Sequence, residues 1–218
     1  MRLLITLIGS LALAACAAED APAPESGAGA DAVRSAVEPP SEEVGSTASP
    51  APRGTGPRVV FVGTSLTAGY GLDDPTAEAW PARVAELAGE AGSPIRVVNG
   101  GVSGDTSAGG LRRLRGLLEA ETAAVVIELG ANDGLRGLPV DALRDNLDAA
   151  VDTVTRYAPD AGVVIVRMQA PPNLGPDYVA GFDRVFDDLD ARAGVLVTPF
   201  ILEGVAADPR LNQPDGIH

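Results

Sequence analysis

The chain has 218 residues, a length that suits one globular domain with additional segments. Its 30 acidic residues outnumber the 16 basic ones, and the resulting net charge of −14 excludes the basic surface that nucleic-acid binding requires. All the basic residues are arginine, and without lysine the chain contains neither a P-loop nor a Schiff-base or Ser-x-x-Lys site.

Residues 1–16 have the pattern of a signal peptide. Arg2 gives a short basic start, and residues 3–15 are an apolar run too short to span a bilayer as a stable helix. The run ends in LAAC, which resembles the bacterial lipobox, whose cysteine is lipid-modified and becomes the mature N-terminus. This cysteine, Cys16, is the only one in the chain, so no internal disulfide can form. We expect a lipoprotein; the alternative is an ordinary secretory signal in which Cys16 is incidental.

The segment after Cys16 predicts where the protein lies and how it is attached. Ala17 replaces the aspartate that tends to retain lipoproteins at an inner membrane, so we expect a periplasmic-side anchor in the outer membrane. Residues 17–57 are rich in Ala, Pro, Ser, Gly and Glu, with almost no large apolar side chains to offset the entropy of ordering. They predict a disordered acidic tether, followed by one domain at residues 58–218.

Within this domain, short β-branched runs alternate with stretches of helical spacing. The predicted strands are 59–62, 95–98, 123–129, 163–166 and 195–197. The predicted helices are 77–87, 111–118, 140–157 and 178–189, the first with Trp80, Val84 and Leu87 on one face. This alternation is typical of an α/β fold with a parallel sheet, here of about five strands, covered by helices on both faces. Ligands bind such sheets at the carboxyl ends of the strands.

The chain's sole histidine, His218, stands three residues after Asp215. A histidine is the usual general base near neutral pH, and a carboxylate at this spacing can turn back and fix its tautomer. Ser65 follows the first strand and becomes a nucleophile if the imidazole lies within hydrogen-bond reach. Its loop is not the Gly-x-Ser-x-Gly elbow, because Thr67 stands where the second glycine should be.

Two further loops, at residues 103–106 (SGDT) and 130–134 (GANDG), leave predicted strand ends. Taken singly, each is more often a turn or a helix cap. Gly104 can nevertheless leave a backbone N–H free to donate, and Asn132 can direct its amide at a developing negative oxygen. A serine, a glycine, an asparagine and an Asp-x-x-His in four loops at one sheet edge together predict a catalytic site.

These four motifs resemble the four blocks of the SGNH (GDSL-type) hydrolases. The strings VVNGGVSGDTSAGGL, ELGANDGLRG and DGIH are similar to the bacterial thioesterase/lysophospholipase/arylesterase branch, and the resemblance covers residues 59–218. It implies a three-layer α/β/α flavodoxin-like fold and hydrolysis of esters or thioesters with no cofactor and no metal. It also assigns Ser65 as nucleophile, His218 as base and then acid, and Asp215 as the group that orients His218. The oxyanion hole would be the N–H groups of Ser65 and Gly104 with the Asn132 side chain.

The chain departs from the family pattern in two places. The family usually has aspartate before the serine, and Thr64 stands there. We expect this change to alter hydrogen bonding in the loop without abolishing the chemistry. Relatives continue past the histidine into a C-terminal helix, so we expect the domain to extend beyond His218.

The substrate is less well defined by the sequence. Family resemblance places residues 170–176 beside the acyl pocket, and we expect Tyr70, Leu135, Pro172 and Asn173 to line it; the alternative for these residues is core or surface packing. A lipoprotein does not readily meet cytosolic acyl-CoA, so lysophospholipids, short acyl esters and aryl esters are favoured over thioesters. We expect a monomer that acts on such small molecules. The alternatives are a carbohydrate O-deacetylase of the same family and a non-catalytic envelope binding module.

Overall fold

The computed structural model describes residues 53–218. The predicted signal peptide and lipid-modified Cys16, and residues 17–52 of the predicted tether, lie outside the described residues. At the start of the described region, Arg53 exchanges two backbone hydrogen bonds with Val97 in an isolated antiparallel bridge. Within residues 53–218, no helix combines the length and the apolar character needed to cross a membrane.

The core element is a sheet of five strands, and every pairing in it is parallel. The strands are β1 (Arg58–Gly63), β2 (Arg96–Gly101), β3 (Thr122–Glu128), β4 (Gly162–Ile165) and β5 (Val195–Val197). Their order in space is β2-β1-β3-β4-β5. The predicted fold class and the strand number are therefore confirmed.

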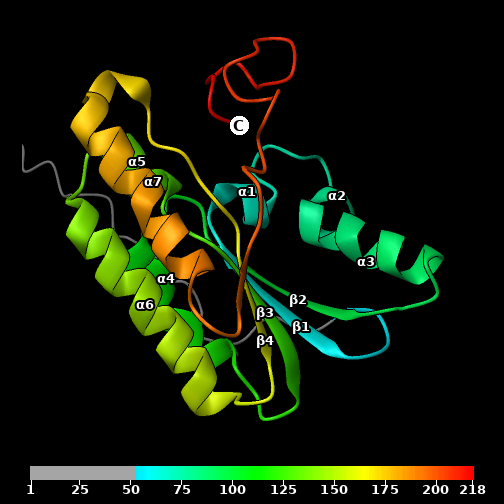
Figure 1. The fold of residues 1–218 in the computed structure, drawn as a ribbon. Helices are drawn as coiled ribbons and strands as arrows, with labels where there is room; N and C mark the ends of the chain where they lie inside the picture. Colours follow the sequence, from blue (N-terminus) through cyan, green and yellow to red (C-terminus); the bar gives the residue numbers. More distant parts are fainter. Residues whose placement is uncertain (1–52) are drawn as a thin grey trace, which may run out of the picture. The chain divides into compact units, whose positions relative to one another are not determined.

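Helices lie on both faces of this sheet (Figure 1). They are α1 (Ser65–Ala68), α2 (Pro75–Glu78), α3 (Trp80–Glu90), α4 (Ser107–Leu117), α5 (Ala131–Leu135), α6 (Val140–Tyr157) and α7 (Pro176–Asp190), with a 3-10 turn η1 (Pro172–Leu174). The larger layer contains α4, α6 and α7, and α3 packs on the opposite face. Helix α6 has the predicted bounds because its apolar residues recur every three or four positions and form one buried stripe.

Two apolar clusters join the layers. The larger one lies between the sheet and α4, α6 and α7, and it includes Phe182 and Phe186, both with no exposed surface. The smaller one consists of Val59, Phe61 and Val97 from β1 and β2, packed against Trp80 and Ala85 of α3. In it the rings of Phe61 and Trp80 meet edge to face, with centroids 5.0 Å apart. Both faces of the first strand are thus buried, which explains its continuous apolar run.

The predicted helix 77–87 is instead two helices, α2 and α3, separated at Ala79, whose ψ of 145° is not helical. Pro75 and Pro81 each stand in the first turn of their helix, and proline favours that position. The predicted apolar face is also wrong in part. Side chains of Val84 and Leu87 are 36% and 59% exposed, because α3 contacts the sheet through Trp80 and Ala85.

Two other elements differ from prediction near strand ends. Helix α4 begins at Ser107, four residues earlier than predicted, because the hydroxyl of Thr106 accepts from the N–H of Gly109 and caps the helix. The segment Ala131–Leu135, for which the sequence predicted a loop, is the short helix α5. Both helices begin at the carboxyl edge of the sheet: α4 follows the loop with Gly104, and α5 itself carries Asn132.

Arg113 of α4 holds the ends of two strands together. Its Nη2 donates to the carbonyl oxygen of Gly63 at 2.9 Å, and its Nη1 donates to the carbonyl oxygen of Gly100. Its Nε donates to Asp105 at 2.6 Å, and both side chains of this pair are mostly buried. One guanidinium thus fixes the ends of β1 and β2 relative to the start of α4.

We expect Arg113→Met to lower the free energy of unfolding by about 2–4 kcal/mol, because a half-buried carboxylate and two carbonyl groups lose their donors. Urea unfolding followed by circular dichroism measures this change. Arg112→Met is the matched control, since Arg112 is exposed and surface changes usually cost less than about 0.5 kcal/mol. Equal losses in the two variants would contradict this role of Arg113.

Candidate active site

Four segments meet at the carboxyl edge of the sheet. Ser65 begins α1, two residues after β1 ends at Gly63, and Gly104 lies in the loop after β2. Asn132 is in α5, which follows β3, and the segment 199–218 reaches the same edge from β5. The tail lies above α1 in Figure 1. Parallel pairing therefore brings together residues that are up to about 150 positions apart in the chain.

Ser65, His218 and Asp215 form one hydrogen-bonded chain. Ser65 Oγ lies 2.7 Å from His218 Nε2, and His218 Nδ1 lies 2.6 Å from Asp215 Oδ2. Ser65 is buried except for 8% of its surface, and the His218 side chain is 15% exposed. The serine hydroxyl is thus within proton-transfer distance of an imidazole whose other nitrogen is bound to a carboxylate.

Asp215 is held in its ionised form by its surroundings. The hydrogen bond from the His218 ring lowers the pKa of Asp215 from its usual value, and the backbone N–H groups of Ile217 and His218 lower it further. Both N–H groups donate to Asp215 Oδ1 at 3.1 Å. The Asp-x-x-His spacing thus gives a turn in which one carboxylate oxygen binds the backbone and the other binds the imidazole.

The loop after α1 anchors the tail that carries this pair. Gln213 Nε2 donates to the carbonyl oxygen of Tyr70 at 2.9 Å. The Tyr70 ring contacts the ring of His218, with centroids 4.6 Å apart and planes inclined at 41°. Next to it, Gly71 has a φ of +77°, and a side chain there would overlap Gln213. The tail therefore contacts the nucleophile's own loop in at least three places.

Three groups able to donate hydrogen bonds belong to residues that line the pocket beside Ser65. Among the described residues, no acceptor takes the N–H of Ser65 or of Gly104, whose φ is +80°. One N–H of the Asn132 amide donates to the carbonyl oxygen of Asp105 at 2.8 Å, which fixes the plane of the amide and leaves its second N–H for another acceptor. The structure thus brings together the three groups that the resemblance assigns to the oxyanion hole.

Two buried carboxylates near the site were not singled out from the sequence. Asp133 accepts from Ser107 N at 2.8 Å and from Ser107 Oγ at 2.5 Å, and Asn146 Nδ2 donates to the same hydroxyl. This network fastens α5, and with it Asn132, to α4. The sequence feature that could have identified Asp133 was its position next to Asn132 in the third motif. An aspartate there is equally typical of a turn.

The second of these carboxylates, Glu128, is the last residue of β3 and has no exposed surface. Burial raises its pKa above the usual value, while hydrogen bonds from Thr64 and Thr67 act in the opposite direction. Thr64, the residue that departs from the family pattern, donates to it through both its N–H and its hydroxyl. A charged residue at the end of a buried apolar strand was the available sequence signal.

A pocket of about 620 Å³ opens at Ser65. Three of the four residues predicted for it, Tyr70, Leu135 and Pro172, are in its lining. The fourth, Asn173, is not, because the turn η1 leaves its side chain exposed. The wall that the sequence did not predict consists of apolar residues from the segment before the last motif: Phe200, Leu202, Val205, Ala206 and Leu211.

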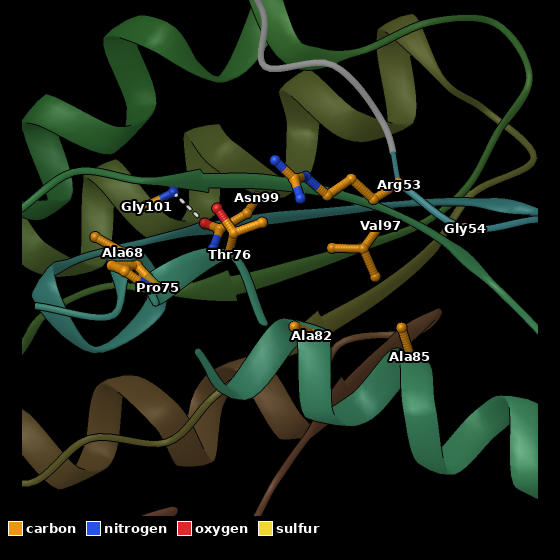
Figure 2. A pocket seen from close by; sticks show the side chains of 10 residues that line it. All are labelled: Arg53, Gly54, Ala68, Pro75, Thr76, Ala82, Ala85, Val97, Asn99 and Gly101. Carbon is orange, nitrogen blue, oxygen red and sulfur yellow. Dashed lines mark hydrogen bonds between the residues drawn. The ribbon is translucent and has the colours of Figure 1, made fainter. Parts of the chain in front are cut away.

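A second cavity, of about 490 Å³, lies between α3 and the edge strand β2 and shares no lining residue with the first (Figure 2). Asn99 in its wall makes two side-chain hydrogen bonds. Its Oδ1 accepts from Gly101 N at 2.9 Å, and its Nδ2 donates to the carbonyl oxygen of Thr67 at 2.8 Å. The Asn99 side chain thus ties the end of β2 to α1, and with it to the nucleophile's helix.

Comparison with known proteins agrees with this geometry. Residues 61–218 match the model of the GDSL-like Lipase/Acylhydrolase family. Esterase TesA of Pseudomonas aeruginosa is 44% identical over 161 residues, which cover 73% of this chain and 78% of that protein. The thioesterase 1/protease 1/lysophospholipase L1 of Escherichia coli K12 is 35% identical over 161 residues, covering 73% of this chain and 74% of that protein.

A solved structure gives the same result in three dimensions. The structure of AlinE4, described as an SGNH-hydrolase family esterase, has a TM-score of 0.68 and is 36% identical. The match covers 76% of this chain and 87% of that one. Sequence, fold and site geometry agree, and the family predicted from the four motifs is confirmed. The chain belongs to the GDSL-like lipase/acylhydrolase family and is a carboxylic ester hydrolase.

Proposed function

We propose that Ser65 is the nucleophile, His218 the general base and Asp215 its orienting carboxylate in a serine esterase. The observation that carries this assignment is the pair of hydrogen bonds, 2.7 Å and 2.6 Å long, that joins Ser65 Oγ to Asp215 through the two nitrogens of one imidazole. Each nitrogen has the partner that proton transfer requires. A histidine with only a structural role has no need of a serine hydroxyl that faces a pocket.

In the acylation step, His218 Nε2 takes the proton of Ser65 as Oγ attacks the ester carbonyl. The carbonyl oxygen becomes negative and moves toward the N–H groups of Ser65 and Gly104 and the Asn132 amide. Because these donors are already oriented, they stabilise the tetrahedral intermediate without reorganisation, and each such donor is typically worth about 10²–10³ in rate. The protonated imidazole, held by Asp215, then gives its proton to the leaving alcohol.

Deacylation repeats these steps with water as the nucleophile. Water takes the place of the departed alcohol beside His218 Nε2, which removes its proton and returns it to Ser65 Oγ when the acid leaves. The ionised Asp215 stabilises the imidazolium in both halves of the cycle. The lowered pKa of Asp215, caused chiefly by the hydrogen bond from the His218 ring, favours this charged form of the carboxylate.

Ser65→Ala should lower kcat for a p-nitrophenyl ester by about 10⁴-fold or more, because in the described part of the chain Ser65 has the one hydroxyl that is hydrogen-bonded to His218. The same variant should take up no phosphonate label, as measured by intact-protein mass spectrometry. Ser93→Ala, at an exposed serine before β2, is the matched control and should leave both measurements unchanged. Activity that survives in Ser65→Ala would refute the assignment of the nucleophile.

We further propose that the acyl group of the substrate is uncharged and apolar. Although the chain carries a net charge of −14, no Asp, Glu or Arg is among the described residues that line the pocket at Ser65. The lining includes the apolar side chains of Leu66, Leu135, Met168, Val205 and Leu211. Lysophospholipids and other esters of fatty acids have acyl groups of this kind.

The rate should therefore rise with acyl length. Each methylene buried in the pocket at Ser65 contributes about 0.8 kcal/mol, or about fourfold in kcat/KM, until the pocket is full. The p-nitrophenyl esters from acetate to palmitate measure this dependence. A matched pair tests charge: the mono-p-nitrophenyl ester of adipate should react about 100-fold more slowly than the hexanoate ester, because its carboxylate is desolvated without a partner. Equal rates for the pair would contradict an uncharged acyl site.

We propose, finally, that Cys16 carries a lipid anchor that holds the esterase at the periplasmic side of a bacterial membrane, favouring the outer one. The support is the apolar run at residues 3–15 and the position of the sole cysteine directly after two alanines. Two or three acyl chains suffice for stable anchoring. An anchored esterase of this kind would meet lipid esters of the envelope.

Expression of the full chain in bacteria grown with labelled palmitate tests the anchor. The label should appear on the wild-type protein and on Ser65→Ala, and it should be absent from Cys16→Ser. The Cys16→Ser protein should also move from the membrane fraction to the soluble fraction while keeping its esterase activity. Palmitate on Cys16→Ser would refute the proposed anchor.

A further inference from the structure

Glu128 contacts the residues on both sides of the proposed nucleophile. Its Oε2 accepts from the N–H of Thr64 at 2.9 Å and from the hydroxyl of Thr67 at 2.8 Å. The hydroxyl of Thr64 lies 3.0 Å from Oε1 and 3.1 Å from Oε2. All three of these residues are at least 99% buried. Glu128 takes no part in the proposed chemical steps. Its carboxyl group nevertheless forms hydrogen bonds with the residues of the turn that carries Ser65.

The direction of these hydrogen bonds is fixed by a fourth residue. Trp80 Nε1 can only donate, and it donates to Thr67 Oγ1 at 3.2 Å. The hydroxyl proton of Thr67 is then directed at Glu128 Oε2, which also receives the Thr64 N–H. Among the described residues, Oε1 has one partner, the hydroxyl of Thr64. A hydroxyl can donate to this oxygen or accept from it, so it matches Glu128 in either protonation state.

The network leaves no room for the turn to shift. A methyl group on Gly63, which precedes Thr64, would overlap the side chains of both Thr67 and Glu128. The hydrogen bonds that link Trp80 of α3 to Thr67 of α1 and Thr67 to Glu128 of β3 are therefore closely packed as well. Close packing of this kind lets a polar network specify one conformation of the backbone.

We infer that Glu128 is a positioning residue for the nucleophile, acting through Thr64 and Thr67 to fix both the Oγ and the N–H of Ser65. This inference rests on the proposed role of Ser65. Attack requires the Oγ of Ser65 to lie in line with the ester carbon. Stabilisation of the oxyanion requires the N–H of the same residue to point at the oxygen. A small shift of the turn displaces both groups at once, and a misplacement of about 1 Å can cost about 100-fold in rate.

The same network accounts for the threonine that precedes the nucleophile. An aspartate at residue 64, the usual residue in the family, would place a second carboxyl group against Glu128 Oε1. Two buried carboxylates at hydrogen-bond distance cannot both be ionised, so one must hold a proton. The hydroxyl of Thr64 makes the contact without a second acid, so the turn keeps its support across the pH range.

The test compares Glu128→Ala, Thr67→Val and Glu128→Gln, with Glu121→Ala as the matched control. Glu121 is an exposed glutamate just before the other end of the same strand. Glu128→Ala should lower kcat by about 100-fold and leave KM within about threefold, because the pocket is intact while the turn is not. Thr67→Val, which keeps the shape of the side chain, should lower kcat by about tenfold.

Rescue by the amide separates positioning from charge. The carbonyl oxygen of Gln can accept from the Thr64 N–H and the Thr67 hydroxyl, and its NH₂ can donate to Thr64 Oγ1. Glu128→Gln should therefore regain at least about tenfold in kcat over Glu128→Ala. If the amide is as slow as the alanine variant, the negative charge matters and the inference is overturned.

The rate at which a phosphonate labels Ser65 distinguishes failure of this inference from failure of the proposed function. If the wild-type protein does not label, the role of Ser65 is wrong. If the wild type labels and a folded Glu128→Ala labels at the same rate, only the positioning role is wrong. Should Glu128→Ala fail to fold by circular dichroism, Thr67→Val decides: wild-type kcat in that variant overturns the inference, and a fall in kcat with unchanged KM supports it.

Discussion

Parallel pairing of β1 with both of its neighbours sets the register on which the site depends. In that register Gly63 lies level with Gly101 on one side and with Glu128 on the other. The three strands therefore end together, and the loops that follow them start from the same line. Side chains distant in the chain can then meet without any element being bent to reach them. Arg113, Asn99 and Glu128 each tie two of these strand ends or loops together by hydrogen bonds.

Charge is distributed very unevenly between the surface and the site. Within residues 53–218, most of the acidic residues are at exposed positions, where ion pairs such as Arg192 with Asp148 and Asp152 contribute little individually. At the site, the carboxylates each have a defined partner: Asp215 has the imidazole, Asp133 has Ser107, and Glu128 has two threonines. The space left for substrate is uncharged, so the chemistry takes place in surroundings of low polarity, where oriented donors act more strongly.

Much of this arrangement could be predicted from the sequence, because apolar periodicity and short motifs are properties of neighbouring residues. The apolar spacing of residues 140–157 gives α6 its bounds, and strand–helix alternation predicts the parallel sheet. The catalytic constellation could be predicted because each member ends or follows a strand. Other features depend on contacts across the fold. The exposed face with Val84 and Leu87 and the buried partner of Thr64 follow from packing that no local pattern encodes. The wall formed by residues 200–211 has no periodicity at all.

That wall and the proposed catalytic base belong to one continuous segment. Leu202, Val205 and Leu211 line the pocket at Ser65. Asp215 and His218 follow a few residues later, in a stretch that consists of turns and not of helices or strands. A fatty acyl chain that fills the pocket thus packs against the same segment of the chain that carries the imidazole of His218. Occupancy and order of this segment are thermodynamically linked: a ligand that binds the ordered form stabilises it by mass action. A long acyl chain would then assist its own hydrolysis, by holding in place the base that cleaves it.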